Sequence, residues 1–287
     1  MIYLVLAAIV WGSSFPVITY ALGDISPVLF LVLRFFTAFS ILLARHHTRK
    51  DLARLFRRDL ILVSIPNALA FILQFKAQEY TTASKTALFV NSSPVFVVML
   101  SAVLWRERFG KRQLAAMLVA LSGVVITSTR LDFSGFSTIN LGDVLCIAVG
   151  LTWAVFILAS KHLTKRYGPY EMSQALYFWS AVMALPLLGL ETARFAWRST
   201  LPILYLAVFP TILGYVFYLK GVRSVSSLAT SIIILIEVVV AFLISHFLLG
   251  ESFSLVESVG VAMVMTGVVM VFGRSRPLRV PDECRPA

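Results

Sequence analysis

One acidic side chain, Glu237, lies near the middle of an almost unbroken apolar stretch that runs from Ser226 to Glu251. As a helix, this stretch is long enough to cross a hydrocarbon core of about 30 Å. A carboxylate at that depth is costly unless it is paired, hydrated or protonated. Glu237 could therefore be a site that takes up and releases protons, or it could hydrogen-bond a solute or a neighbouring helix. We favour hydrogen bonding, because no second buried acid or histidine is evident to complete a proton relay.

Polar and aromatic residues recur with helical spacing on one face of two other apolar segments, at residues 59–79 and 200–220. Large polar side chains facing lipid would be costly, so both faces are expected to point into the protein. Contacts that only join helices are the alternative, but amides and tyrosines fit a cavity wall better. The residues are Asn67, Phe71, Gln74 and Gln78 in the first segment and Thr211, Tyr215 and Tyr218 in the second.

Three tryptophans lie well inside apolar segments: Trp11, Trp153 and Trp179. Tryptophan often marks the membrane interface, but the depth of these three favours a cavity wall. In the segment 82–104, Ser93 shares one helical face with other hydroxyl side chains, so it is also a candidate for the wall. Asn91 points away from that face and is a weaker candidate.

Arg34 is a basic residue inside the apolar segment 27–44. It could pair with an acid, hold the carboxylate of a substrate, or extend its long side chain towards the membrane surface. These three alternatives stay open at the level of sequence.

The composition identifies a multi-pass membrane protein, because 59% of the residues are hydrophobic and only 14% are charged. The net charge of +11 does not indicate nucleic-acid binding, since the basic residues sit in short segments between apolar runs. The sequence contains no phosphate-binding GxxxxGK[ST] run, HExxH pair or GxSxG turn, so an enzyme, a metal site and a cofactor are not expected. We expect a fold composed only of helices, with ten membrane spans. Their ranges are 2–22, 27–44, 59–79, 82–104, 113–129, 141–162, 171–190, 200–220, 226–249 and 255–273.

The distribution of lysine and arginine predicts the orientation. Nineteen of these residues lie in the connections after even-numbered spans and in the tail, and five lie on the other side. Both termini are therefore expected in the cytoplasm, in a cell (inner) membrane. The tail at residues 274–287 is polar and rich in proline, and is expected to be disordered.

The second half of the chain repeats the first at an offset of 142 to 144 residues. Trp11 matches Trp153, Thr86 matches Thr230, and the motif that begins at Gly123 matches the one at Gly267. We expect two repeats of five spans, at residues 1–130 and 131–273. An odd number of spans in each repeat makes them inverted with respect to the membrane, which places a binding site at the midplane between them.

Several motifs of this sequence resemble those of the EamA-type family of the drug/metabolite transporter superfamily. The resemblance is carried by Trp11-Gly-Ser-Ser-Phe, by Arg34 after Pro27, and by Leu235-Ile-Glu237-Val in the second half. It covers nearly the whole chain and implies a ten-helix fold that transports small organic metabolites, often exporting amino acids or drugs. The family usually has proline after this glutamate, and Val238 replaces it here, so this helix is expected to be straighter than in the family.

The sequence thus predicts a secondary transporter of a small, amino-acid-like or aromatic solute, working by alternating access and in the direction of export. A broad drug exporter or lipid flippase is the nearest alternative, and a receptor or an intramembrane enzyme is a more distant one. The expected partners are a small-molecule substrate and membrane lipid, with no nucleic acid, and the protein is expected to be a monomer. The candidate cavity residues are Trp11, Asn67, Phe71, Gln74, Ser93, Trp153, Trp179, Tyr215, Tyr218 and Glu237.

Overall fold

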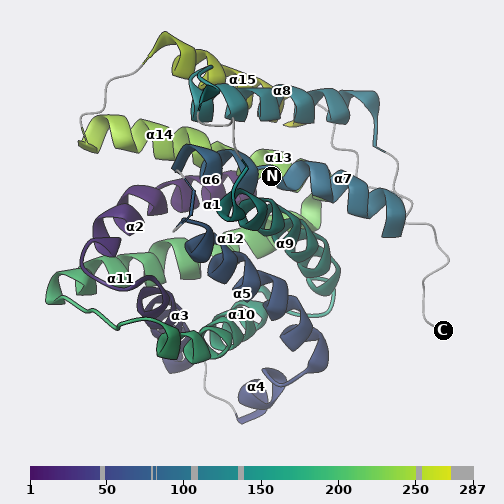
Figure 1. Cartoon of the computed structure of the whole chain (residues 1–287). Helices are drawn as coiled ribbons and strands as arrows, with labels where there is room; N and C mark the ends of the chain where they lie inside the picture. Colours follow the sequence, from purple (N-terminus) through teal and green to yellow (C-terminus); the bar gives the residue numbers. More distant parts are fainter. Residues whose placement is uncertain are drawn as a thin grey trace, which may run out of the picture.

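The computed structural model describes residues 1–45, 49–78, 80–81, 83–104, 109–134, 139–249 and 254–272. Within these ranges the chain forms helices and no strand, apart from one isolated antiparallel bridge between Ile25 and Phe195 (Figure 1). Ten helical segments in the described residues are long and apolar enough to cross a membrane, which confirms the expected all-helical, ten-span fold. The tail at 274–287, predicted to be disordered, lies outside the described residues.

The first half contains five spans. The first is formed by α1 (Ile2–Gly12) and α2 (Ser14–Leu22), and the second by α3 (Pro27–Arg45). A short helix, α4 (Arg49–Arg54), connects it to the third span, α5 (Arg58–Gln78). The fourth span consists of α6 (Ala83–Val90) and α7 (Ser93–Leu104), and the fifth is α8 (Lys111–Thr129).

The second half also contains five spans. They begin with α9 (Leu141–Leu163) and with α10 (Pro169–Ala184), which continues as the 3-10 helix η2 (Leu185–Leu190). The next span joins several helix types: η3 (Trp197–Ser199), α11 (Thr200–Leu206), the π-helix η4 (Ala207–Leu213), α12 (Gly214–Gly221) and η5 (Val222–Ser224). The last two spans are α13 (Ser227–Ile234) with α14 (Ile236–Leu249), and α15 (Leu255–Phe272).

Contacts between the halves occur in matching pairs. Helix α5 of the first half packs on α9 of the second half. The helices at the matching positions, α12 of the second half and α1 of the first, also pack on each other. Likewise α6 and α7 contact α9, while α13 and α14 contact α1. Each contact thus has a partner at the offset seen in the sequence, as expected when two similar units pack around a common axis.

Helices α8 and α15 lie side by side along their lengths at the top of Figure 1. The matching glycines Gly123 and Gly267 allow this approach. A Cβ at Gly123 would lie 2.5 Å from the carbonyl oxygen of Gly260, and one at Gly267 would lie 2.6 Å from that of Ala116. Small residues permit such close backbone packing in membranes, where van der Waals contact drives helix association.

The fourth and ninth spans are interrupted at equivalent positions. Helix α6 ends before Asn91 and α7 begins at Ser93, while Leu235 separates α13 from α14. Asn91 and Leu235 are 144 residues apart. The ninth span is interrupted at Leu235, although no proline follows Glu237. Paired interruptions of this kind in the two repeats of a membrane protein are a marker of a central binding site.

Candidate functional site

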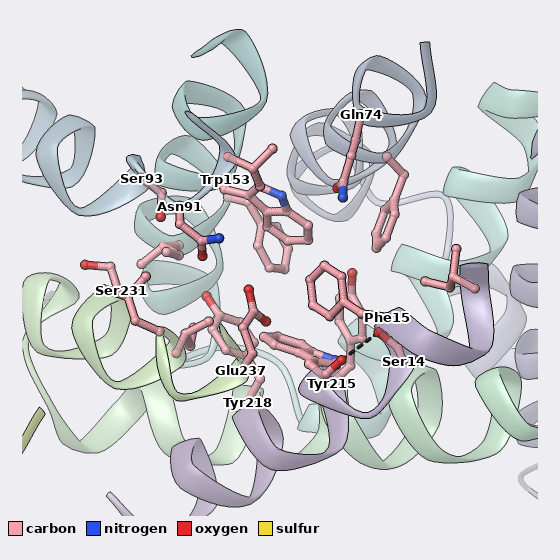
Figure 2. A pocket seen from close by; sticks show the side chains of 18 of the residues that line it. Ser14, Phe15, Gln74, Asn91, Ser93, Trp153, Tyr215, Tyr218, Ser231 and Glu237 are labelled. Carbon is pink, nitrogen blue, oxygen red and sulfur yellow. Dashed lines mark hydrogen bonds between the residues drawn. The ribbon is translucent and has the colours of Figure 1, made fainter. Parts of the chain in front are cut away.

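A central cavity of about 170 Å³ lies between the two halves of the chain. Both interrupted spans contribute to its wall, together with α1, α2, α3, α5, α9 and α12. Figure 2 shows the side-chain amides of Gln74 and Asn91 and the carboxylate of Glu237 pointing into the space beside the Trp153 ring. The wall is therefore mostly apolar and aromatic, with a few convergent polar groups, which is the usual composition of a small-molecule site.

Eight of the ten predicted candidates lie in this wall. They come from helices far apart in the chain, and their binding of a solute stays a prediction. They are Trp11, Phe71, Gln74, Ser93, Trp153, Tyr215, Tyr218 and Glu237.

Asn67 lies behind the wall and is fully buried. Its Oδ1 accepts a hydrogen bond of 2.6 Å from the hydroxyl of Tyr215, and its Nδ2 donates one of 2.9 Å to Ser180 Oγ. The amide thus holds the Tyr215 ring in place. Asn67 does not line the cavity, contrary to the sequence prediction, because Tyr215 lies between them.

Trp179 also lies away from the cavity, so its predicted place in the wall is wrong. Its Nε1 donates a hydrogen bond of 2.8 Å to the carbonyl oxygen of Leu55, between α4 and α5. Its ring packs edge-on against Phe56 and Phe178, at 5.7 and 5.3 Å between ring centroids. These contacts fix α10 to the α4–α5 connection, a long-range contact that helical spacing does not reveal.

Several residues of the wall were not among the ten candidates. Asn91, the weaker candidate in the sequence, lines the cavity beside Ser93, although on one continuous helix the two would face different sides. The interruption between α6 and α7 changes the direction of the chain and brings both to the same space. Ser14 and Phe15 follow a similar interruption at Ser13, and Phe156 lies one turn after Trp153 on α9. The spacing from Trp153 to Phe156 was the one signal available in the sequence.

The π-helix η4 organises the aromatic part of the wall. The carbonyl oxygen of Pro210 accepts a hydrogen bond of 2.8 Å from Trp11 Nε1, and that of Thr211 accepts one of 2.7 Å from the hydroxyl of Tyr177. The Trp11 ring then packs against Tyr215 and Tyr218, at 5.4 and 5.5 Å between centroids. Short π-helical segments often occur at functional sites, and here one supplies the carbonyl groups that fix Trp11 of the other half and Tyr177 of α10.

Arg34 contributes a positive charge to the cavity. Its side chain is only 3% exposed, so it does not extend to the membrane surface. Its Nε donates a hydrogen bond of 2.8 Å to Thr211 Oγ1. Its guanidinium carbon lies 5.5 Å from the centroid of the Phe71 ring and 5.8 Å from that of Phe35, where the ring faces attract a cation.

Glu237 contributes a carboxyl group in the first turn of α14. The N-terminal end of a helix favours a carboxylate, which offsets part of the cost of removing it from water. In the part of the chain that the structure describes, neither Arg34 nor Glu237 forms an ion pair. Those same residues contain no group of three or more histidine, cysteine, aspartate or glutamate side chains able to hold a metal ion.

Ten apolar spans around a central cavity define a membrane transporter fold, and sequence comparison gives the family. The chain belongs to the EamA-like transporter family, whose model matches residues 1–129 and again residues 140–273. It is a membrane-embedded transporter of this family, as the sequence predicted.

Individual relatives resemble the chain over nearly its full length. A protein of Archaeoglobus fulgidus described as an uncharacterized transporter is 26% identical, over 93% of this chain and 84% of its own length. A protein of Streptantibioticus cattleyicolor described as a probable terminal-alkyne amino-acid exporter is 28% identical, over 98% of this chain and 97% of its own. A solved structure, described as a crystal structure of a protein, shares the fold with a TM-score of 0.77 and 16% identity, over 94% of this chain and 97% of its own.

Proposed function

We propose that this protein is a secondary transporter that exports a small, amino-acid-like or aromatic solute by alternating access. One observation carries the proposal: a central cavity, shared by both halves, combines aromatic walls with one basic and one acidic side chain, Arg34 and Glu237. Aromatic faces can hold an apolar or aromatic side chain, and the polar groups can hold the charged head of the solute.

The kind of solute follows from the size and polarity of the cavity. A volume of about 170 Å³ suits a small metabolite and is too small for a whole membrane lipid. A purely apolar wall would have favoured a broad drug exporter, but Gln74, Asn91 and the two charged residues give this wall a specific polar pattern. The name of the Streptantibioticus cattleyicolor relative supports an amino acid and the direction of export.

The proposal includes a place and an orientation. The distribution of basic residues supports a cell (inner) membrane with both termini in the cytoplasm. Two inverted repeats, at residues 1–130 and 131–273, would then expose the cavity alternately to the two sides. The matching contacts between the halves support this arrangement. We propose a monomer as the working unit.

An exchange experiment tests the function. Vesicles containing the purified protein and loaded with one unlabelled amino acid should accumulate the same labelled amino acid from outside, if it is a substrate. A panel of amino acids and nucleosides, together with a fluorescent drug, covers the alternatives. We expect exchange of amino acids with apolar or aromatic side chains. Exchange of the drug or nucleosides alone would contradict the proposed solute class.

A matched pair of substitutions connects transport to the cavity. Gln74→Leu removes an amide from the wall, whereas Gln113→Leu removes one whose Nε2 donates to Ser226 Oγ at 3.3 Å, outside the wall. We expect Gln74→Leu to impair exchange and Gln113→Leu to retain it, with similar expression of both. Equal kinetics in the two variants would place the solute elsewhere.

A further inference from the structure

One basic and one acidic side chain line the same cavity, and each lacks an ionic partner among the described residues. An unpaired charge inside a membrane protein is expensive, and such residues usually mark a solute or ion pathway. The hydrogen-bond donors of Arg34 and the acceptors of Glu237 that have no protein partner therefore indicate which chemical groups of a solute the cavity can bind.

The guanidinium of Arg34 is held at one end and free at the other. A guanidinium has five N–H donors, and in the described structure only Nε has a partner, Thr211 Oγ1 at 2.8 Å. The flanking rings of Phe35 and Phe71 restrict its movement. The terminal Nη1 and Nη2 groups remain available as a parallel pair of donors, the geometry that a carboxylate accepts with both oxygens.

The carboxylate of Glu237 is likewise available. It points into the cavity in Figure 2, and the described structure contains no donor hydrogen-bonded to it. A carboxylate accepts hydrogen bonds on both oxygens, and a primary ammonium group can supply up to three N–H donors. Glu237 therefore matches a positively charged amine.

The two groups belong to different halves of the protein: Arg34 lies on α3 and Glu237 on α14. A solute with one charge would satisfy one side chain and leave the other unpaired when water is excluded from the cavity, at a substantial cost in free energy. A zwitterion satisfies both. Rejection of singly charged analogues would then follow from the charge left unpaired, which is how a binding site gains specificity.

Building on the proposed function, we propose that Arg34 and Glu237 are the specificity-determining pair of the cavity: Arg34 binds the carboxylate and Glu237 the ammonium group of a zwitterionic amino acid. The solute then spans both halves, with its side chain against the aromatic wall. Thr211 acts as a positioning residue, because it fixes the orientation of the Arg34 guanidinium.

Ligand binding to the purified, full-length protein tests the pair. The probes are L-phenylalanine, 3-phenylpropionate, which lacks the amine, and 2-phenylethylamine, which lacks the carboxylate. L-leucine with 4-methylpentanoate and 3-methylbutylamine forms a second series. We expect the amino acid of at least one series to bind about tenfold or more tightly than both of its singly charged analogues, as the loss of a charged contact implies. Equal or tighter binding of the analogues in both series would overturn the proposal.

Substitutions then assign each charge to its partner. Glu237→Gln should weaken binding of the amino acid about tenfold or more and leave the amine-free acid unchanged. Arg34→Gln should weaken the amino acid and leave the carboxylate-free amine unchanged. The analogue that still binds shows that each variant is folded. If a variant loses all three ligands of a series alike, the side chain shapes the cavity and does not recognise one charge, and the proposal fails.

Conservative and distant substitutions complete the test. Arg34→Lys keeps the positive charge and should recover part of the affinity that Arg34→Gln loses. If Arg34→Gln does not fold, Arg34→Lys is compared with the unsubstituted protein: it should weaken binding of the amino acid and leave the carboxylate-free amine unchanged. Glu171→Gln and Arg198→Gln alter ion pairs outside the cavity, with Arg54 at 3.6 Å and Asp24 at 3.1 Å, and should leave affinity unchanged. Binding of a zwitterion without exchange in vesicles would reject the proposed function alone. If both Arg34→Gln and Glu237→Gln exchange the solute as the unsubstituted protein does, only the proposed role of this pair is rejected.

Discussion

The Nζ atom of Lys85 lies 2.8 Å from Oδ2 of Asp143, and both side chains are almost fully buried. Asp143 also accepts hydrogen bonds from Thr81 Oγ1, at 2.5 Å, and from the backbone N–H of Asn140, at 3.1 Å. The pair thus connects α6 to the first turn of α9. Because every charge in this cluster has a partner, removing one of them leaves the other buried and uncompensated.

We therefore predict that Lys85→Met destabilises the protein by about 3–5 kcal/mol. Thermal unfolding of the purified protein in detergent measures the change. Arg198→Met is the matched control, since Arg198 pairs with Asp24 at 3.1 Å while its side chain is 73% exposed. Exposed pairs contribute at most about 1 kcal/mol, so a similar loss in both variants would contradict the prediction.

Two tryptophans should separate transport from packing. Trp153 lines the cavity, whereas Trp179 donates to the carbonyl of Leu55 away from it. We expect Trp153→Leu to raise the KM for the solute, because it removes an aromatic face from the wall. Trp179→Leu should lower the unfolding temperature and leave KM unchanged. Exchange kinetics and thermal unfolding of both variants check this, and a raised KM in Trp179→Leu alone would reverse the assignment.

The predicted orientation can be tested by labelling single cysteines in intact cells with a reagent that does not cross the membrane. In a background with Cys284→Ser, a cysteine at Ser134 should react from outside, because the connection between α8 and α9 is expected on the outer side. A cysteine at Lys165, between α9 and α10, should react only after the cells are opened. The remaining Cys146 is buried and should stay silent. The opposite pattern would invert the orientation.

Tyr167 gives a prediction for alkaline pH. Its hydroxyl donates a hydrogen bond of 2.6 Å to Asp59 Oδ2, and its carbonyl oxygen accepts one of 2.8 Å from Arg223 Nη2. Burial raises the pKa of Tyr167, and the hydrogen bond to Asp59 raises it further. The stabilisation is then complete below the unfolded pKa of about 10 and is lost as pH rises through the higher folded value.

Tyr167→Phe should accordingly lower the unfolding temperature at neutral pH, with a difference from the unsubstituted protein that shrinks above about pH 10. Unfolding curves between neutral and alkaline pH measure this difference. Tyr170→Phe is a suitable control, because Tyr170 is an exposed tyrosine nearby. A constant difference across the range would show that the hydroxyl does not contribute through its protonation.

The spans could be predicted from sequence because hydropathy over about 20 residues depends only on local composition. All ten predicted ranges overlap the observed spans. The wall was partly predictable for the same reason: helical spacing identifies an inward face, as it did for Phe71, Gln74, Tyr215 and Tyr218.

The remaining features depend on where a helix stops and on contacts between distant segments. No proline or glycine at Leu235 indicates that the helix is interrupted there. The interruption at Asn91 places the side chain of that residue in the cavity wall. Asn67 was assigned to the correct face, but the Tyr215 side chain from the other half lies in front of it. Such packing between the halves cannot be read from spacing within one helix.

Helices α8 and α15, which approach closely at Gly123 and Gly267, join the two halves of the protein by packing. Arg34 and Gln74 come from one half and Tyr215 and Glu237 from the other, so neither half alone can form the cavity. The long contact between α8 and α15 holds the two halves together through side-chain packing. This contact does not require the two halves to be covalently connected. Two separately translated polypeptides, 1–134 and 135–287, should therefore find each other in the membrane and restore exchange that neither supports by itself.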